Sequence, residues 1–402
     1  MTGRSTADVP LLGAALLVVA SMTVAAVDMQ TYRTLYREDG WGEWATALAF
    51  FAAAGVYACA ARQLLAASHA AGWRRFIGPV GMCVLLSAFA LFVAGEELSW
   101  GQRLFGYRPP DAFLAHNFQQ ESNLHNLLKP LISTRVVVAG IALVWGVVGP
   151  VVARLGHAPA WLCAAPSTVA VFAAVAAVEL IYPVKLSGEV AELLLGLAFV
   201  GDAMARWSGA PTLVRRGLLW ACLALAAPIP GVVDALTVAT SAELARTEAV
   251  LQRIAIAVGA DGVITDAGRG KRSIHKRVYT AIQAGYLDLG RRAAGVDPYF
   301  LDPWQSPLWI RSRRRGGKMA VMVYSFGPNR RRDTDTRKVL KALHKEPGFT
   351  AARGGLGAGD DVAVGLSLRI VDEGAEPVDQ RPDILMDGAH NGGDRAAQDG
   401  QD

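Results

Sequence analysis

The sequence predicts a membrane-embedded all-α bundle of about seven transmembrane helices, followed by a small α+β domain with an antiparallel sheet. Two observations support this fold class. Hydrophobic residues make up 52% of the 402-residue chain, and long apolar runs fill it up to about residue 240. Charged residues are concentrated after that point, where short runs alternate apolar and polar side chains as strands do. We therefore expect a transmembrane domain over residues 1–240, an extracytoplasmic domain over 241–371 and a disordered tail over 372–402.

Seven apolar runs are each close to the roughly 20 residues that cross a bilayer as a helix. They are residues 9–27, 44–64, 76–95, 135–154, 159–180, 189–206 and 216–238. Pro228 and Pro230 should kink or interrupt the last run, because proline has no backbone N–H to donate inside a helix. The fifth and sixth runs are the least well defined, because they carry or adjoin Glu179, Glu189, Glu192 and Asp202.

The basic residues of the loops predict the orientation. Arginines follow the second, fourth and sixth spans, at Arg62, Arg74, Arg75, Arg154, Arg206, Arg215 and Arg216. On the other side, acidic neighbours dilute Arg33 and Arg37, although a long third loop with further cations weakens the bias. Because basic loops stay in the cytoplasm, the N-terminus should be cytoplasmic and the domain after the seventh span extracytoplasmic. We expect a multi-pass protein of a bacterial inner membrane.

The most unusual stretch begins where the third span ends. Two adjacent carboxylates stand at this exit, and an arginine, two histidines and several amides follow. A charge at mid-membrane costs roughly 2.5–3.5 kcal/mol on insertion scales, so such groups need partners or a function. The predicted binding residues of this outer loop, residues 96–134, are Glu96, Glu97, Arg103, His116, Glu121, Asn123, His125 and Asn126. After the break at Pro109-Pro110, residues 112–131 are expected to form an amphipathic or re-entrant helix.

Glu96, Glu97 and His125 are the candidate catalytic residues, and three interpretations stay open. A glutamate with one or both histidines can bind a divalent metal for hydrolysis, or a glutamate can act as a general base. The same groups can instead bind a small molecule or a lipid headgroup. The third interpretation is a structural network that pins the loop, in which Glu97 pairs with Arg103. Glu96 would then pair with Asn123 or His125.

Two segments of this loop carry a resemblance. Gly95-Glu-Glu-Leu-Ser-Trp-Gly-Gln-Arg103, with Asn123-Leu-His-Asn126 further on, resembles a recurrent signature of uncharacterised bacterial multi-span membrane proteins. The resemblance implies a membrane setting and no particular activity, so it does not choose among the three interpretations.

After residue 240 the pattern predicts a helix packed on a short sheet. Acidic residues open a helix from Ser241 to about Val258, which has one apolar face at a 3.6-residue period. Further helices are expected at 273–289 and 336–344. Strand-like runs cover residues 307–311, 319–325 and 362–370.

Three short motifs occur in order in this part of the chain. They are Asp302-Pro-Trp-Gln-Ser-Pro307, Tyr324-Ser-Phe-Gly-Pro-Asn329 and Gly359-Asp-Asp-Val362. Over about residues 242–370 they resemble the soluble domain of the major pseudopilin of type II secretion. The resemblance implies a bound Ca²⁺, whose candidate ligands here are Asp360, Asp361, Asn329 and Asp335. Asn329-Arg330 departs from the Asp-Gly of that family, which removes one carboxylate from the site.

These features predict a membrane protein that displays a pseudopilin-like domain outside the membrane, as a binding or assembly module linked to secretion or envelope machinery. The alternative is a membrane-embedded enzyme, with or without a divalent metal, acting on a lipid or lipid-linked substrate at Glu96 and His125. Membrane lipids and proteins are the expected partners. Nucleic acid is not, because the basic clusters at 311–315 and 330–337 lack interleaved aromatic residues. All four cysteines lie in apolar runs, which argues against disulfides and zinc.

Overall fold

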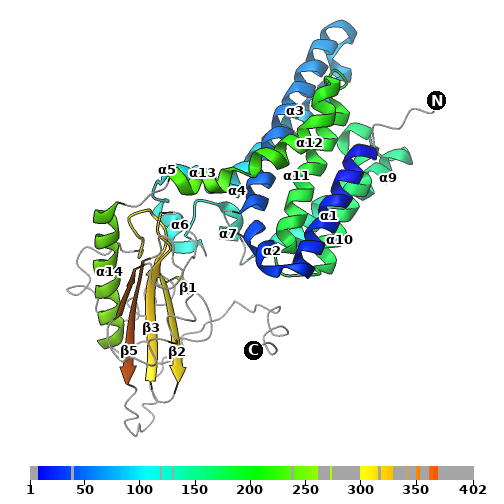
Figure 1. Cartoon of the computed structure of the whole chain (residues 1–402). Coiled ribbons are helices and arrows are strands. Elements are labelled where there is room, and N and C mark those ends of the chain that lie inside the picture. The colour runs from blue at the N-terminus through cyan, green and yellow to red at the C-terminus, as the bar shows by residue number, and fades with distance from the viewer. Residues whose placement is uncertain are drawn as a thin grey trace, which may run out of the picture.

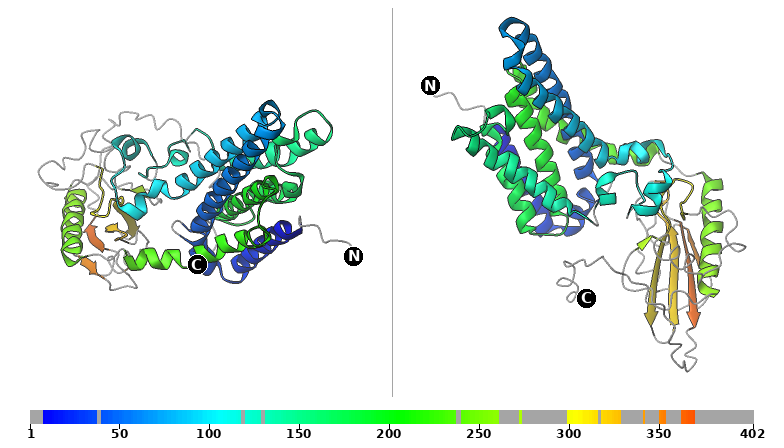
Figure 2. Two further views of the ribbon diagram at one scale, coloured as in Figure 1. Left: turned by 90° about the horizontal axis from the view of Figure 1, so that it is seen from above. Right: turned by 180° about the vertical axis from the view of Figure 1, so that it is seen from behind.

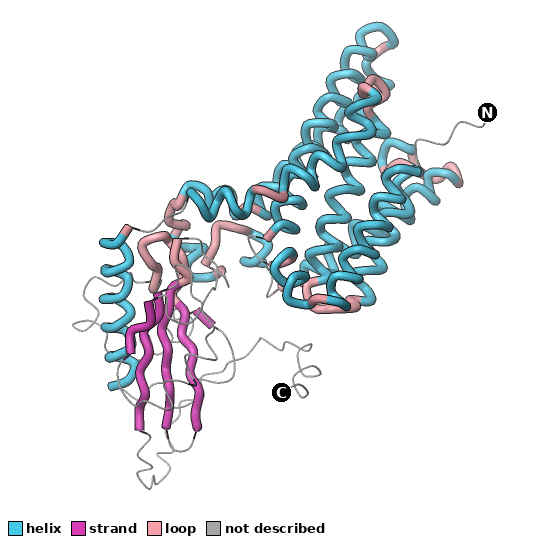
Figure 3. The backbone as a smooth tube through the Cα atoms, in the orientation of Figure 1, coloured by secondary structure: helices cyan, strands magenta, loops and turns pink. Residues whose placement is uncertain are grey.

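The computed structural model shows a helical bundle joined to a smaller unit built on a sheet (Figures 1 and 3). The described residues are 8–37, 40–117, 120–128, 131–236, 240–260, 272–273, 299–315, 318–328, 341, 350–353 and 362–369. The bundle ends with helix α13, which leads toward the sheet unit in all three views (Figures 1 and 2).

The helices of the bundle follow the predicted apolar runs closely. In chain order they are α1 (Asp8–Val27), α2 (Met29–Leu35), α3 (Trp41–Ala71), α4 (Ile77–Glu97), α8 (Thr134–Gly140), α9 (Gly149–Arg154), α10 (Val169–Ile181), α11 (Ser187–Arg206), α12 (Thr212–Ala226) and α13 (Ile229–Leu236). The fifth predicted span is shorter than expected, because 3₁₀ turns at Ala160–Leu162 and Pro166–Thr168 precede α10. The break predicted at the two prolines is confirmed, since α12 ends before Pro228 and α13 begins after it.

Among the described residues, three helices are long and apolar enough to cross a membrane. They are Trp41–His69, Ile77–Glu97 and Thr134–Arg154. Shorter apolar helices cover Ala15–Val27, Pro166–Ile181 and Gly217–Val233. Helix α11 is long but carries four charged side chains, at Glu189, Glu192, Asp202 and Arg206. Length and composition therefore support a membrane protein, while the count of seven spans stays a prediction.

The outer faces of two of these helices are apolar. On α4, Val84, Leu85 and Leu91 are each more than half exposed, and Val136 and Val144 are so on the helix Thr134–Arg154. Contiguous exposed apolar faces of this kind indicate surroundings other than water. A lipid-facing position for both helices accounts for them.

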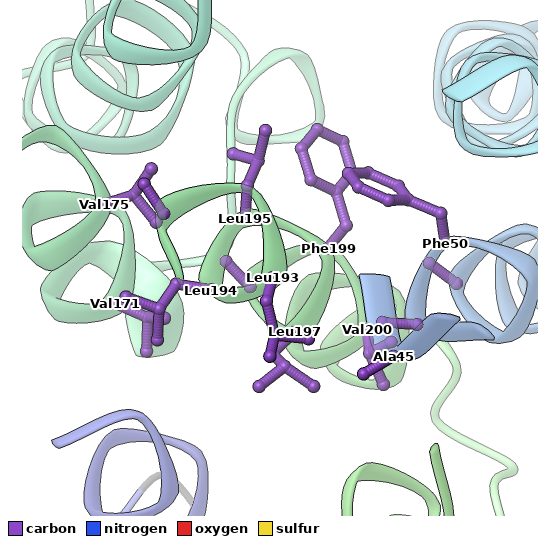
Figure 4. Packing of buried hydrophobic residues seen from close by; sticks show 14 of the residues in the cluster. Ala45, Phe50, Val171, Val175, Leu193, Leu194, Leu195, Leu197, Phe199 and Val200 are labelled. Atoms are coloured by element: carbon purple, nitrogen blue, oxygen red, sulfur yellow. The ribbon is translucent and has the colours of Figure 1, made fainter. Parts of the chain in front are cut away.

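Helix α11 lies at the centre of the bundle, packed against α3 and α10. Its Phe199 stacks on Trp145 with ring centroids 5.1 Å apart and also contacts Phe50 and Phe172. Figure 4 shows Phe199 beside Phe50, with the leucines of α11 filling the space toward Val171 and Val175. Aromatic residues bury large apolar areas, so this cluster is the main packing centre of the bundle.

The helix Thr134–Arg154 contains a π-helical segment, Ile141–Val148, that the sequence did not predict. Gly146 lies so close to Phe172 that a Cβ atom would stand 2.3 Å from the ring, so only glycine fits there. The carbonyl of Trp145, inside this segment, accepts a hydrogen bond of 3.2 Å from the Ala164 N–H. Packing against α10 and the loop before it accounts for the altered helix.

The bundle has two distinct ends. The Ser87 hydroxyl donates to the Ala54 carbonyl, and Ala60 and Ala61 pack with Cys83, so α3 and α4 are antiparallel. The connections that contain Arg74, Arg75 and Arg154 and the C-terminus of α11 therefore share one end, which we call the arginine end. At the opposite end α4 finishes and α8 begins. The polar loop, residues 98–133, joins them there.

The polar loop is not the single helix that was predicted over residues 112–131. It contains α5 (Gln102–Phe105), α6 (Asp111–His116) and α7 (Leu124–Leu128), and the described residues between α6 and α7 are non-helical. Asn117, the residue after α6, has an extended backbone, and Gln120 has a left-handed one with φ of 59°. The prediction of one helix over residues 112–131 was wrong, because side-chain hydrogen bonds, described below, hold the residues around Asn117 and Gln120 in a non-helical conformation.

In its described residues, the C-terminal unit is a five-stranded antiparallel sheet with one helix on its face (Figure 1). The elements are α14 (Ser241–Ala260), β1 (Arg272–Ser273), β2 (Trp309–Arg315), β3 (Lys318–Ser325), β4 (Thr350–Arg353) and β5 (Val362–Arg369), with strand order β1-β2-β3-β5-β4. Helix α14 contacts β3 and β5, and its Leu251 and Ile254 are fully buried. The helix predicted from Ser241 and the three predicted strands are confirmed. The helices predicted at 273–289 and 336–344 lie almost entirely outside the described residues.

Asp302 locks the turn that leads into β2. One carboxylate oxygen accepts the N–H groups of Trp304 at 3.0 Å and Ser306 at 2.8 Å. The other accepts the Ser325 hydroxyl at the end of β3, at 2.6 Å. The Asp-Pro-Trp motif thus has a structural role in this chain, because its aspartate hydrogen-bonds both to the turn and to the sheet.

Candidate functional site

The candidate site is built where α4 stops. Ser99, Trp100 and Gly101 follow with φ of 45°, 55° and 81°, which is left-handed backbone at three successive positions. Such a conformation costs a non-glycine residue roughly 1–2 kcal/mol, so surrounding contacts must hold it. The Trp100 ring lies over Gly95, where a Cβ would stand 2.9 Å from it. The turn therefore reverses the chain tightly and brings the rest of the loop back over Glu96.

Glu96 is buried, and both of its carboxylate oxygens are used. Oε1 accepts the indole N–H of Trp100 at 2.7 Å. Oε2 accepts the backbone N–H groups of Leu124 at 2.6 Å and His125 at 2.8 Å, the first two residues of α7. A carboxylate on the first N–H groups of a helix satisfies donors that would otherwise be unpaired. Glu96 thus caps the N-terminus of α7, although it precedes Leu124 by 28 positions in the chain. This cap fixes α7 to the end of α4.

A second layer of hydrogen bonds holds the middle of the loop. The Glu121 carboxylate accepts the Ser99 hydroxyl at 3.0 Å and the Asn123 amide at 2.9 Å. The Asn117 side-chain amide donates to the carbonyls of Glu121 and Asn123, at 2.6 and 2.9 Å. The Gln102 side chain accepts the Ser122 N–H at 2.8 Å. This network replaces the backbone bonds that a helix would have made, which explains the missing helix between α6 and α7.

Two buried atoms of the loop have no hydrogen-bond partner among the described residues. They are Gln120 Oε1 and Ser122 Oγ. The other end of the Gln120 amide donates to the carbonyl of Tyr299, 3.1 Å away in the C-terminal unit. The Arg108 guanidinium also lies over the Tyr299 ring, 5.3 Å from its centroid, while it pairs with Asp111 at 2.7 Å. The polar loop is therefore in direct contact with both units of the chain.

The structure brings Glu96 and His125 together, as the sequence predicted. His125 Nδ1 lies 3.5 Å from Glu96 Oε2, and the His125 side chain is 41% exposed. Glu121, Asn123 and the backbone of His125 belong to the same network, and Asn126 is buried beside them. Two partners were predicted for Glu96, Asn123 and His125. The structure places the His125 side chain, rather than that of Asn123, beside the Glu96 carboxylate.

Other predicted site residues stand apart from this arrangement. His116 ends α6, is exposed, and takes no part in the described hydrogen bonds of the network. Glu97 is only partly buried, one position beyond the cap. The side chain of Arg103 lies outside the described residues, so its predicted pairing with Glu97 stays a prediction.

No group of three or more His, Cys, Asp or Glu side chains that could hold a metal ion occurs in the described part of the chain. At Glu96 the oxygens already accept three N–H groups, so the residues present favour a cap over a metal ligand. The four candidate calcium ligands, Asn329, Asp335, Asp360 and Asp361, lie outside the described residues.

A second buried cluster was not predicted as a unit. Asp202 accepts the Tyr57 hydroxyl at 2.6 Å, the Ala165 N–H at 2.6 Å and the Arg206 guanidinium at 2.7 Å. Arg206 also donates to the carbonyls of Trp161 and Cys163. The signal was present in the sequence, because an aspartate and an arginine four residues apart lie on one face of a helix. Inside an apolar span that spacing indicates a buried ion pair.

A further ion pair, between the exposed Arg135 and the buried Glu179, lies at the end of the bundle that carries the polar loop. Arg135, at the start of α8, donates to the Glu179 carboxylate at 3.3 Å and to its carbonyl at 2.6 Å. The same guanidinium covers the Tyr182 ring at 4.1 Å. These contacts give Glu179 the partner that its place in an apolar helix requires.

No family model, curated protein or solved structure matches this chain.

Proposed function

We propose that this chain is an integral inner-membrane protein that holds its C-terminal α+β unit at the outer face of the membrane, as a binding or assembly module. The observation that carries the proposal is the double contact of the polar loop. Glu96 fixes the loop to α4, and Gln120 and Arg108 fix the same loop to Tyr299. The polar groups of this loop bond to the helical bundle and to the C-terminal unit. The loop is therefore suited to holding the C-terminal unit in a defined position.

The positions of the arginines support the proposed orientation. Arg74, Arg75 and Arg154 lie at the arginine end, and Arg215 and Arg216 fall in the first turns of α12, directly after α11 returns there. The polar loop and α14 follow helices that finish at the other end. Under the positive-inside rule the arginine end is cytoplasmic, and seven alternating crossings then leave the C-terminal unit outside.

The resemblance to the pseudopilin domain supports the choice of a protein-binding role in secretion or envelope machinery. One helix on an antiparallel sheet and the Asp302 turn agree with that layout. Calcium remains part of the proposal through Asp360 and Asp361. Calcium should raise the thermal unfolding midpoint of the full chain and leave that of an Asp360→Asn/Asp361→Asn variant unchanged. Equal midpoints with calcium and with chelator in the parent chain would remove calcium from the proposal.

Topology is tested first, with single cysteines in a full chain whose four native cysteines are replaced. Ala245→Cys lies on an exposed position of α14, and His157→Cys on an exposed position of the arginine end. We expect a membrane-impermeant maleimide added to spheroplasts to label position 245 and to leave position 157 unlabelled until the cells are lysed. The reverse pattern would place the C-terminal unit in the cytoplasm and end the proposal.

The binding role is tested in cells with a photo-crosslinking residue at position 245 or 249, which are both exposed on α14. A binding module should give discrete adducts to one or a few proteins, and the same residue at position 157 is the matched control. If positions 245 and 249 give no adducts, or the same ones as position 157, the C-terminal unit has no dedicated partner.

The second candidate function is an enzyme, and the specific observation that favours it is the Glu96–His125 contact. A buried carboxylate beside an exposed imidazole can orient the ring so that His125 serves as a general base. The test is hydrolysis of a panel of phosphoester and acyl-ester lipids by the full chain in nanodiscs. Turnover that is lost in His125→Ala and kept in His157→Ala would favour the enzyme. Equal rates in both variants would reject His125 as the base.

A further inference from the structure

The polar loop has an inverted distribution of side chains. Most of its buried side chains are polar, namely Ser99, Gln102, Asn117, Gln120, Ser122, Asn123 and Asn126, although Leu114 is also fully buried. Seven large apolar side chains of its described residues are exposed, namely Trp100, Leu104, Phe105, Leu124, Leu128, Leu131 and Ile132. The exposed polar residues of the loop include Arg108, Asp111, His116 and His125. A surface loop in water shows the opposite arrangement, because apolar side chains gain by leaving water. The outer face of this loop therefore requires an apolar cover.

The exposed apolar face is continuous with the apolar outer faces of the bundle. Phe92, on the exposed side of α4, meets the Trp100 ring edge-on with centroids 5.7 Å apart, and Trp100 is itself 48% exposed. At the other end of the loop, Ile132 leads within one turn to the exposed Val136 of α8. Because exposed apolar residues join the loop to a candidate span at both of its ends, we expect these parts of the loop to have the same surroundings as the spans.

The most exposed apolar residues of the loop lie at positions that suit contact with the membrane interface. Phe105 and Leu131 are each 80% exposed, near the first and last parts of the loop. Trp100 has its ring outward while its N–H is bonded to Glu96, which is the amphipathic placement of a tryptophan at a membrane boundary. The polar atoms of Glu96 and Asn123 are turned inward, so this part of the loop can lie against acyl chains without leaving them in hydrocarbon.

We propose that the outer face of the polar loop is an interfacial lipid-binding surface, with phospholipid acyl chains next to the headgroups as its occupant. The residues that contact lipid are Trp100, Leu104, Phe105, Leu124, Leu128, Leu131 and Ile132. The loop then lies flat in one leaflet as a monotopic element between α4 and α8. It holds Tyr299, and with it the C-terminal unit, at the headgroup level. This inference rests on the membrane location in the proposed function and on no other part of it, since it holds for either leaflet and with or without a protein partner.

The test uses the full chain, with native cysteines replaced, in phosphatidylethanolamine–phosphatidylglycerol nanodiscs. An environment-sensitive fluorophore is attached to Phe105→Cys or Leu131→Cys, at two separate points of the surface. Asp111→Cys, exposed and polar on the same loop, is the matched aqueous control. Leu85→Cys, exposed in the middle of α4, is the lipid control.

We expect nitroxide carried at the fifth acyl carbon to quench positions 105 and 131 at least threefold more than a water-soluble nitroxide does. Position 111 should show the reverse preference. Quenching of positions 105 and 131 by the aqueous reagent, as at position 111, would overturn the proposal. Protection from both quenchers would also overturn it, because a second copy of the chain or another protein would then cover the face. Using two positions keeps the test decisive if one labelled variant does not fold.

Discussion

Two buried carboxylates at opposite ends of the bundle are satisfied in different ways. Asp202 pairs with a guanidinium that is only 12% exposed, and every described partner it has belongs to the bundle. Glu96 accepts neutral N–H groups from a loop, and the exposed His125 side chain lies beside its carboxylate. The first carboxylate therefore holds the bundle together, whereas the second holds a separate segment against it.

This difference predicts which variants lower the stability of the whole chain and which weaken only one contact between its parts. A buried ion pair that loses one member leaves a charge without compensation, and that penalty falls on the fold itself. A cap that is removed leaves unpaired N–H groups in a loop, which can find new partners by moving. The four predictions below test this contrast, in order of decreasing effect.

Asp202→Asn should be the most damaging change, because it leaves the Arg206 charge buried. We expect a loss of about 3–5 kcal/mol of unfolding free energy, measured by equilibrium unfolding of the full chain in mixed micelles. The double variant Asp202→Leu/Arg206→Met removes both charges and should cost less than Asp202→Asn alone. An Asp202→Asn chain as stable as the parent would show that the pair does not hold the bundle.

Glu96→Ala should cost about 2–3 kcal/mol, because three N–H donors lose a charged acceptor. The loss should be local. Hydrogen exchange at the amides of Leu124 and His125 should accelerate strongly, while the amides of α11 keep their protection. Glu97→Gln, one position on and partly exposed, is the matched control and should have a smaller effect. Equal acceleration throughout the bundle would mean that Glu96 is part of its core.

Arg108→Gln tests the contact between the loop and the C-terminal unit. Loss of the guanidinium from the face of Tyr299 should weaken that attachment by about 0.5–1 kcal/mol. The measurement is limited proteolysis near residues 237–240, between α13 and α14, which should become faster while the bundle fragment stays intact. Arg154→Gln, exposed at the arginine end, is the control and should leave the cleavage rate unchanged.

Asp28 is an exposed carboxylate and should show the smallest effect. It caps α2, and the Thr31 hydroxyl with the N–H groups of Thr31 and Gln30 lowers its pKa. A carboxyl with a lowered pKa in the folded chain adds stability above its ordinary pKa of about 3.9, and loses it as the pH falls through the lower folded value. The unfolding midpoint should therefore fall slightly more between pH 5 and pH 3 in the parent than in Asp28→Asn. Parallel curves would show that the cap adds no stability.

The sequence was a good guide wherever the local pattern decided the structure. Apolar length located the helices α1, α4 and α11, and the prolines located the break before α13. The period of α14 predicted the face that buries Leu251 and Ile254. In each case the residues that decide the element are close neighbours in the chain.

What the sequence could not predict depends on contacts between distant residues. The turn at Ser99 and the cap on α7 require Glu96 to meet Leu124, which no local pattern indicates. The π-helical segment packs at Gly146 against Phe172, a residue 26 positions away in the chain. Tyr299 received no role in advance, because its contacts come from Gln120 and Arg108.

The central claim is that Glu96, through the polar loop, keeps the C-terminal unit in a fixed position on the bundle. Spin labels at Lys185→Cys, between α10 and α11, and at Ala245→Cys, on α14, report that position as a distance distribution in the full chain. The account predicts one narrow distribution in the parent that broadens in Glu96→Ala and stays narrow in Glu97→Gln. A distribution that is equally narrow in Glu96→Ala, or already broad in the parent, would contradict it.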